Sequence, residues 1–186
     1  MDSTEINIEP SEIPYRVFDN INLKALSIRL EEFDLGYRES LKPNFLIRLI
    51  HLEKLSLTGI QISPEIFINE ICKLTLLKEL TLMYSGINKI PSEIENLVNL
   101  QAIVFRCNPI DSFPESIVNL KKLKSINLID NHFKKIPINL LKLRKLKSLI
   151  LRDNPIDSKY QNLIDSKGYV KLKEGRSLID TASLKK

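Results

Sequence analysis

Two consecutive segments of equal length decide the fold. Residues 100–122 read LQAIVFRCNPIDSFPESIVNLKK, and residues 123–145 read LKSINLIDNHFKKIPINLLKLRK. Aliphatic residues or phenylalanine occupy the same places in both segments, and both segments carry an asparagine at the ninth place and a proline at the fifteenth. A period of 23 residues therefore runs through this part of the chain, and such self-similarity is typical of a repeat architecture.

The same frame extends in both directions. Its opening pattern, apolar residues at the first, fourth and sixth places, recurs 23 residues earlier from Leu77 and 23 residues later from Leu146. A looser copy begins at Leu52 and a degenerate one at Leu23. We therefore expect about six repeats over residues 23–156, the first two irregular, between an N-terminal cap at residues 1–22 and a C-terminal cap and tail at residues 157–186.

The start of each unit predicts a short strand. Leu80 and Leu82 flank Thr81, an alternation that buries one face of an extended segment. A single unit of this size is too small to bury that face alone, so neighbouring units must stack. Stacked units form a parallel sheet along one side of a solenoid.

The frame resembles that of the leucine-rich repeat family, in its short 23-residue class. The resemblance implies an α/β solenoid, a right-handed horseshoe segment with a parallel sheet on the concave face and helices or 3-10 turns on the convex face. It also implies that Asn108, Asn131 and Asn154 bond to backbone at the bend after each strand, with Ser85 a weaker substitute. In the longer segments 30–51 and 63–74, helical spacing of apolar residues predicts true helices.

Composition and charge exclude several classes of protein. The 186 residues include 26 isoleucines and 30 leucines but three alanines, which favours an aliphatic repeat over an alanine-rich bundle. The longest apolar runs are about four residues, so we expect no membrane span. The acidic N-terminus lacks the features of a secretory signal, and two cysteines fit a reducing compartment. We expect a cytoplasmic protein, bacterial by its isoleucine, lysine and asparagine usage, with secretion by a signal-independent route as the alternative.

No motif for catalysis, for a metal or for a cofactor is present, so we predict neither an enzyme nor a bound cofactor. His132 reads as a solvated turn residue, and Cys107 as a small, half-buried residue without a base to activate it. Asp130 and Asp153 occupy equivalent places in adjacent repeats and could pair as metal ligands. The flanking arginines favour a salt-bridged surface instead.

The outward side chains of the strands form the candidate binding face. We predict an apolar strip edged by charged and aromatic side chains, which suits a protein or peptide partner. Exposed isoleucine and valine could also reflect strand propensity alone. The predicted site comprises Met83, Tyr84, Val104, Arg106, Ile129, Asp130, Ile150 and Arg152.

The C-terminal half of the chain is basic and supplies a second candidate. Residues 94–186 hold 18 Lys and Arg against nine Asp and Glu. A lateral ladder, Lys121, Lys122 and Lys124 with Arg144, Lys145 and Lys147 one repeat later, could bind an anionic ligand such as nucleic acid or a membrane surface. Nucleic acid is disfavoured because no aromatic residues interleave to stack bases, and solvation explains the lysines as well. The favoured function is a monomeric, non-catalytic protein-interaction module.

Overall fold

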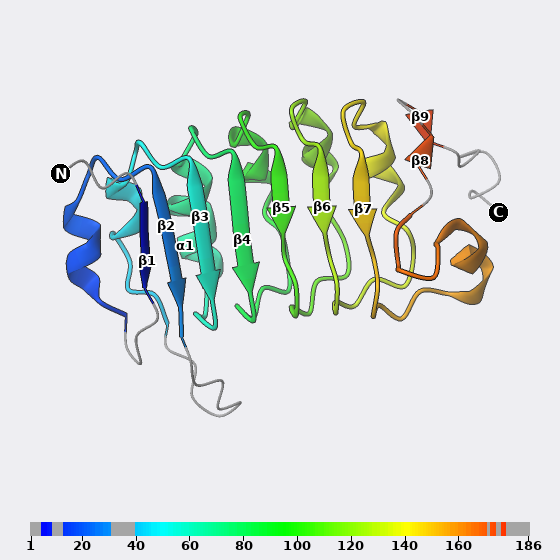
Figure 1. Cartoon of the computed structure of the whole chain (residues 1–186), viewed down its shortest axis with the longest axis horizontal. Coiled ribbons are helices and arrows are strands. Elements are labelled where there is room, and N and C mark those ends of the chain that lie inside the picture. The colour runs from blue at the N-terminus through cyan, green and yellow to red at the C-terminus, as the bar shows by residue number, and fades with distance from the viewer. Residues whose placement is uncertain (1–4, 9–12, 31–39, 171, 174–175, 178–186) are drawn as a thin grey trace.

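The computed structural model describes residues 5–8, 13–30, 40–170, 172–173 and 176–177. A seven-stranded parallel sheet in sequential order β1 to β7 forms one side of the molecule (Figure 1). Each strand is short because the frame holds only two or three alternations before the bend. The strands are β1 Glu5–Ile8, β2 Ala25–Arg29, β3 Lys54–Thr58, β4 Glu79–Met83, β5 Ala102–Val104, β6 Ser125–Asn127 and β7 Ser148–Ile150.

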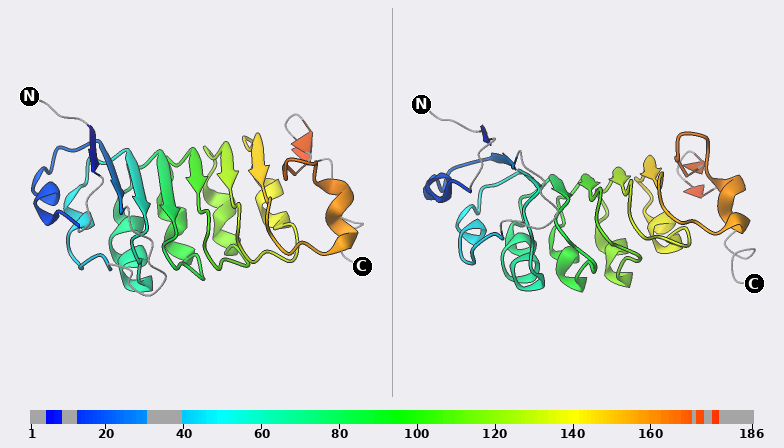
Figure 2. Two further views of the ribbon diagram at one scale, coloured as in Figure 1. Left: turned by 60° about the horizontal axis from the view of Figure 1, so that its bottom comes forward. Right: turned by 90° about the horizontal axis from the view of Figure 1, so that it is seen from below.

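Short helices cover the opposite side, and the row of strands curves gently inward in the right-hand view of Figure 2. This is the predicted leucine-rich repeat solenoid, with its sheet on the concave face. The proline at the fifteenth place of the frame, preceded by isoleucine or phenylalanine, is the N-cap of a single 3-10 turn in each regular repeat. The 3-10 helices are η1 Tyr15–Asp19, η2 Leu46–Arg48, η3 Ile71–Lys73, η4 Ser92–Asn96, η5 Glu115–Asn119, η6 Ile138–Lys142 and η7 Ser158–Leu163.

The two long convex segments behave differently from each other. Residues 63–74 contain the predicted helix, α1 Pro64–Asn69, which starts where the Ser63 hydroxyl accepts a hydrogen bond from the Ile66 amide. The helix predicted within residues 30–51 is wrong for the described part from residue 40 onwards, which contains only η2. Buried Glu70 explains the difference, because its carboxylate accepts hydrogen bonds from the amides of Asn44 (2.7 Å) and Leu46 (2.8 Å) and fixes a non-helical bend there.

Both ends of the sheet have features that the frame did not predict. Residues 5–8 form β1, in register with β2, although we expected no repeat element before residue 23. At the other end, η7 is followed by a tight turn that pairs with β7 through two bonds, Leu151 N–H to the Gly168 carbonyl (2.8 Å) and Val170 N–H to the Leu149 carbonyl (2.9 Å). The described part of the C-terminal cap expected from residue 157 therefore begins with a 3-10 helix and this turn.

One continuous core of leucine, isoleucine and phenylalanine runs the length of the solenoid. Frame residues such as Leu80, Ile103 and Leu128 are at most 1% exposed. Burial of this kind contributes about 25 cal/mol per Å² of apolar surface. Among the described residues, no helix has the length and apolar character needed to cross a bilayer.

The predicted asparagine ladder follows the strands on the inside of the bend. The Asn131 amide group donates to the carbonyls of Phe105 and Leu128 and accepts from the Ile110 amide. Asn108 makes the corresponding bonds one repeat earlier, donating to the Leu82 carbonyl and accepting from the Ile87 amide, and it also accepts from the Ser85 amide (3.0 Å). The role expected from the resemblance is confirmed for these residues.

Candidate functional site

Because the strands pair in register, the outward-facing side chains of neighbouring strands line up in columns across the sheet. Thr81, Val104, Asn127 and Ile150 are direct partners across β4 to β7. The next outward column, two residues further along each repeat, contains Met83, Arg106, Ile129 and Arg152. Backbone bonds beyond the strands keep that column aligned, because Tyr84, Cys107 and Asp130 donate their amides to the carbonyls of Arg106, Ile129 and Arg152.

The predicted apolar strip is therefore a zigzag between two columns. Met83, Val104 and Ile150 are half-buried and present part of their side chains outward. Ile129 is only 7% exposed, so it adds little area to the strip. The Ile129 amide donates a local hydrogen bond to the Asn127 side chain at 3.2 Å.

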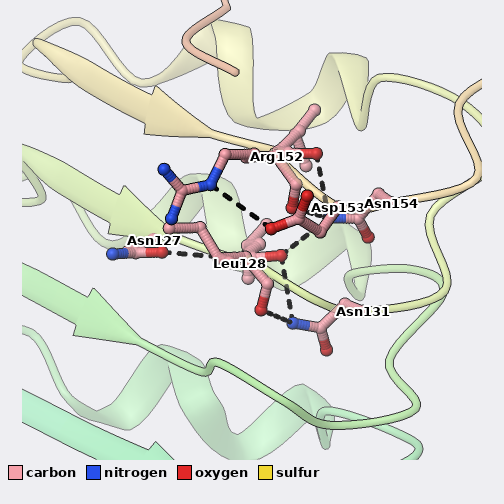
Figure 3. Close-up of polar contacts among 8 residues, drawn as sticks. Asn127, Leu128, Asn131, Arg152, Asp153 and Asn154 are labelled. Carbon is pink, nitrogen blue, oxygen red and sulfur yellow. Dashed lines mark hydrogen bonds and ion pairs between the residues drawn. The ribbon is translucent and has the colours of Figure 1, made fainter. Parts of the chain in front are cut away.

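Two arginines border the strip. The Arg152 side chain reaches Asp153 at 3.3 Å, and Figure 3 shows this pair beside Asn127 on the outer side of the bend. Arg106 is half-buried, and its Nε atom is inaccessible without a hydrogen-bond partner. An unpaired buried donor costs about 1–3 kcal/mol. In its column, Arg106 lies between Met83 and Ile129, so it places a positive charge next to the strip.

Next to the arginine column lies a column of residues in the left-handed conformation: Tyr84, Cys107, Asp130 and Asp153, with φ from 52° to 58°. The first three are joined by side-chain hydrogen bonds. The Tyr84 hydroxyl donates to the Cys107 sulfur, a bond that raises the pKa of Tyr84. Burial, first, and hydrogen bonding to Asp130 raise the pKa of the Cys107 thiol. Cys107 is therefore held as a neutral thiol, which is a poor nucleophile.

The histidines and carboxylates considered as catalytic or metal-binding candidates do not form a site. His51 and His132 are both exposed, and His132 lies in the predicted turn after β6. No group of three or more His, Cys, Asp or Glu within the described ranges could hold a metal ion. Asp153 forms the expected ion pair with Arg152, so the salt-bridged interpretation holds for that aspartate.

The comparisons with known proteins agree with this architecture. The family model described as a leucine-rich repeat region matches residues 39–178, about three quarters of the sequence. The chain belongs to the leucine-rich repeat family. Members of this family typically mediate protein–protein interactions and are generally non-enzymatic scaffolds. No curated protein gives a significant match.

Two solved structures illustrate the likeness. A leucine-rich repeat protein of Leptospira interrogans superposes with a TM-score of 0.65 and 26% identity over 85% of this chain and 45% of its own. An internalin of Listeria monocytogenes superposes with a TM-score of 0.52 and 20% identity over 84% of this chain and 55% of its own. This leucine-rich repeat chain thus spans about half the length of these neighbours.

The sequence interpretation missed one feature of the solenoid flank. Each strand from β2 to β7 is entered through a β-turn closed by a backbone bond of 2.9–3.1 Å, such as Leu100 N–H to the Leu97 carbonyl. The two central residues of each of these turns are exposed, apart from half-buried Asn99. The signal was available in the sequence, because these central residues are the pair immediately before each opening leucine of the frame.

Proposed function

We propose that this protein is a non-catalytic interaction module whose concave sheet face binds a protein or peptide. The observation that carries the proposal is the pair of aligned columns across β4 to β7, where half-exposed Met83 and Val104 lie next to Arg106 and half-exposed Ile150 continues the strip two strands further along. An apolar centre with arginine and tyrosine nearby has the composition of an energetically productive interface. Family membership supports the same reading, since leucine-rich repeats typically bind other proteins.

The proposed contact residues take different roles. Tyr84, 37% exposed, and Arg152 form the rim, and Asp130 and Arg152 give that rim mixed charge. Such a rim selects a partner segment with both polar and apolar groups, and it sets the encounter rate more than the affinity. The full proposed face is Met83, Tyr84, Val104, Arg106, Ile129, Asp130, Ile150 and Arg152, of which Ile129 is the most buried. We propose that the protein acts as a monomer, in the cytoplasm of a bacterium or after signal-independent secretion.

A charge reversal on this face tests the proposal. Proteins captured from lysate by the immobilised wild-type chain are identified, and the affinity of the strongest is measured directly. The double variant Arg106→Glu and Arg152→Glu should weaken that binding at least tenfold, equivalent to about 1.4 kcal/mol. Circular dichroism should show an intact fold, because neither side chain is part of the core.

The matched control reverses charge on the flank with Lys121, Lys122, Lys145 and Lys147 changed to Glu. This control variant should bind the partner with the wild-type affinity, and at most its association rate should fall. A partner that is lost with the flank variant and kept with the concave variant would contradict the proposal.

A further inference from the structure

The flank of the solenoid is the surface formed by the β-turns that lead into strands β2 to β7. It has an unusual pattern of side chains. Its six β-turns stack in register, because the residue after each opening leucine accepts backbone bonds from the next repeat, as at Lys78, Gln101 and Lys124. The turns therefore form one row along the end of the sheet at which the strands begin (Figure 1). At about 4.8 Å per strand, the row is about 25 Å long. Its central pairs are Ile21–Asn22, Ile50–His51, Thr75–Leu76, Val98–Asn99, Lys121–Lys122 and Arg144–Lys145.

The first four turns each expose one large aliphatic side chain. Ile21 is 52% exposed, Ile50 59%, Leu76 43% and Val98 54%. Polar residues and glycine dominate β-turns, and the backbone bond that closes the turn makes no use of an aliphatic side chain. These four residues are not part of the core, and the stacking of consecutive repeats places them in one row, which we call the apolar edge.

The last two turns are wholly cationic. Lys121, Lys122, Arg144 and Lys145 are all exposed, and none of the four ion pairs within the described residues involves them. The bonds of Lys121 and Lys122 go to neutral oxygens, the Val118 carbonyl and the Asn99 side chain. Three of these cations, with Lys142, line a depression of about 410 Å³.

The turns themselves have no negative charge to offset these cations, because none of their twelve central residues is acidic. Of the carboxylates beside the row, Glu53 is paired with Lys78 at 2.6 Å and Glu79 with Lys54 at 3.3 Å, and Glu95 accepts a hydrogen bond from the Asn119 side chain. The Lys78 bond also holds the pKa of Glu53 below its ordinary value. The flank thus combines an apolar edge with a basic end.

We infer that this flank docks the protein onto the surface of an anionic lipid bilayer. Peripheral membrane binding needs buried apolar area together with electrostatic attraction to anionic headgroups, and the row supplies both along one line. Separate aliphatic tips can enter the interfacial region independently, whereas a protein partner would need a matching series of pockets. The basic depression has room for a phosphate-bearing headgroup. This site is distinct from the concave face, so one molecule could bind a membrane and a protein together.

Vesicle binding tests the inference through its two components. The wild type should sediment with phosphatidylcholine vesicles containing 30% phosphatidylglycerol at least ten times more strongly than with pure phosphatidylcholine. Binding to the anionic vesicles should fall at least tenfold in the variant Lys121→Gln, Lys122→Gln, Arg144→Gln and Lys145→Gln. Binding to the same vesicles should fall several-fold in the variant Ile50→Ser, Leu76→Ser and Val98→Ser. This difference from the wild type should persist at high salt, where charge attraction is screened.

The control for charge removes four exposed cations elsewhere, with Lys89, Lys134, Lys135 and Lys159 changed to Gln. It should bind vesicles as the wild type does. An equal loss in this control would overturn the inference, because attraction by net charge alone would then explain binding. Wild-type binding to inorganic tripolyphosphate or a DNA oligonucleotide without vesicle binding would also overturn it.

A tryptophan probe gives a second readout that does not depend on affinity. The chain has no tryptophan, so Val98→Trp places a single one at the apolar edge. Its emission should shift to the blue on phosphatidylglycerol vesicles and be quenched by brominated lipid. The matched probe Asn88→Trp, exposed in the loop after β4, should show neither effect. Identical responses from both probes would rule out insertion of the flank.

Discussion

Asparagine side chains at the bend connect neighbouring repeats where backbone bonds alone do not suffice. The Asn154 amide donates to the Leu128 carbonyl (2.8 Å) in the preceding repeat, and its oxygen accepts from the Phe133 amide (3.0 Å). A backbone group left unpaired in the interior costs about 1–3 kcal/mol. The position after left-handed Cys107, Asp130 and Asp153 is therefore occupied by an amide side chain, which both donates and accepts, whereas Ser85 follows left-handed Tyr84.

Asn131→Ala should lower the free energy of unfolding by about 1–3 kcal/mol, because it leaves the Phe105 carbonyl and the Ile110 amide without their partner. Urea denaturation measures the change. The companion variant Ser85→Asn should be neutral or stabilising, since the Ser85 hydroxyl makes only a short local bond to the Met83 carbonyl. An Asn131→Ala protein as stable as the wild type would show that water replaces the amide.

The Cys72 thiol links stability to alkaline pH. Burial first, and then the charge of Glu93, raise its pKa to about 12 from an ordinary value of 9.0. Between these values the unfolded chain loses the thiol proton and the folded chain keeps it, so rising pH favours unfolding, by up to about 4 kcal/mol in total. The stability of the wild type relative to Cys72→Ala should therefore be constant below pH 9 and fall above it. Urea titrations from pH 8 to 10.5 measure this difference, and a constant difference would refute the linkage.

At the scale of elements, the alternation of the frame fixed what could be predicted. Leu80 and Leu82 must share a buried face, and a slip of one residue would expose both, so the register of β4 followed from the sequence. The column that contains Met83 and Arg106 followed in the same way. These are properties of spacing, and a single sequence shows spacing directly.

Elements shaped by contacts distant in the chain could not be predicted. The bend before η2 depends on Glu70, which lies 24 residues beyond Leu46 and reads in the sequence as an ordinary surface residue. Ile129 is buried although the alternation places it on the outward side, a detail that alternation alone does not contain. β1 was missed because its four residues, Glu5–Ile8, carry too little of the frame.

At the scale of the molecule, a solenoid presents several long surfaces built from the same repeat, and each can carry its own pattern. The concave face is set by residues within and just after the strands, and the flank by the pair before each opening leucine. Substitutions at either set leave the shared core unchanged. The two proposals are therefore separable by experiment.

The last prediction concerns the closed end of the solenoid. A parallel sheet leaves an unpaired edge at its last strand, and such edges promote association. Here the turn around Gly168 covers β7, with φ at +84° and the backbone of Arg152 close by. A Cβ at this position would lie 2.7 Å from Arg152 Cα, so alanine cannot fit without displacing the turn.

Gly168→Ala should lower the free energy of unfolding by about 1–3 kcal/mol, the order of strain for a disfavoured backbone conformation. It should also make the protein associate as concentration rises, measured by light scattering after size exclusion. Lys167→Ala is the control, because Lys167 is exposed and contributes only its backbone amide to the turn. An uncovered β7 would offer its backbone N–H and C=O groups for pairing with a second chain. A Gly168→Ala protein that is destabilised but stays monomeric would therefore mean that something other than this turn protects β7.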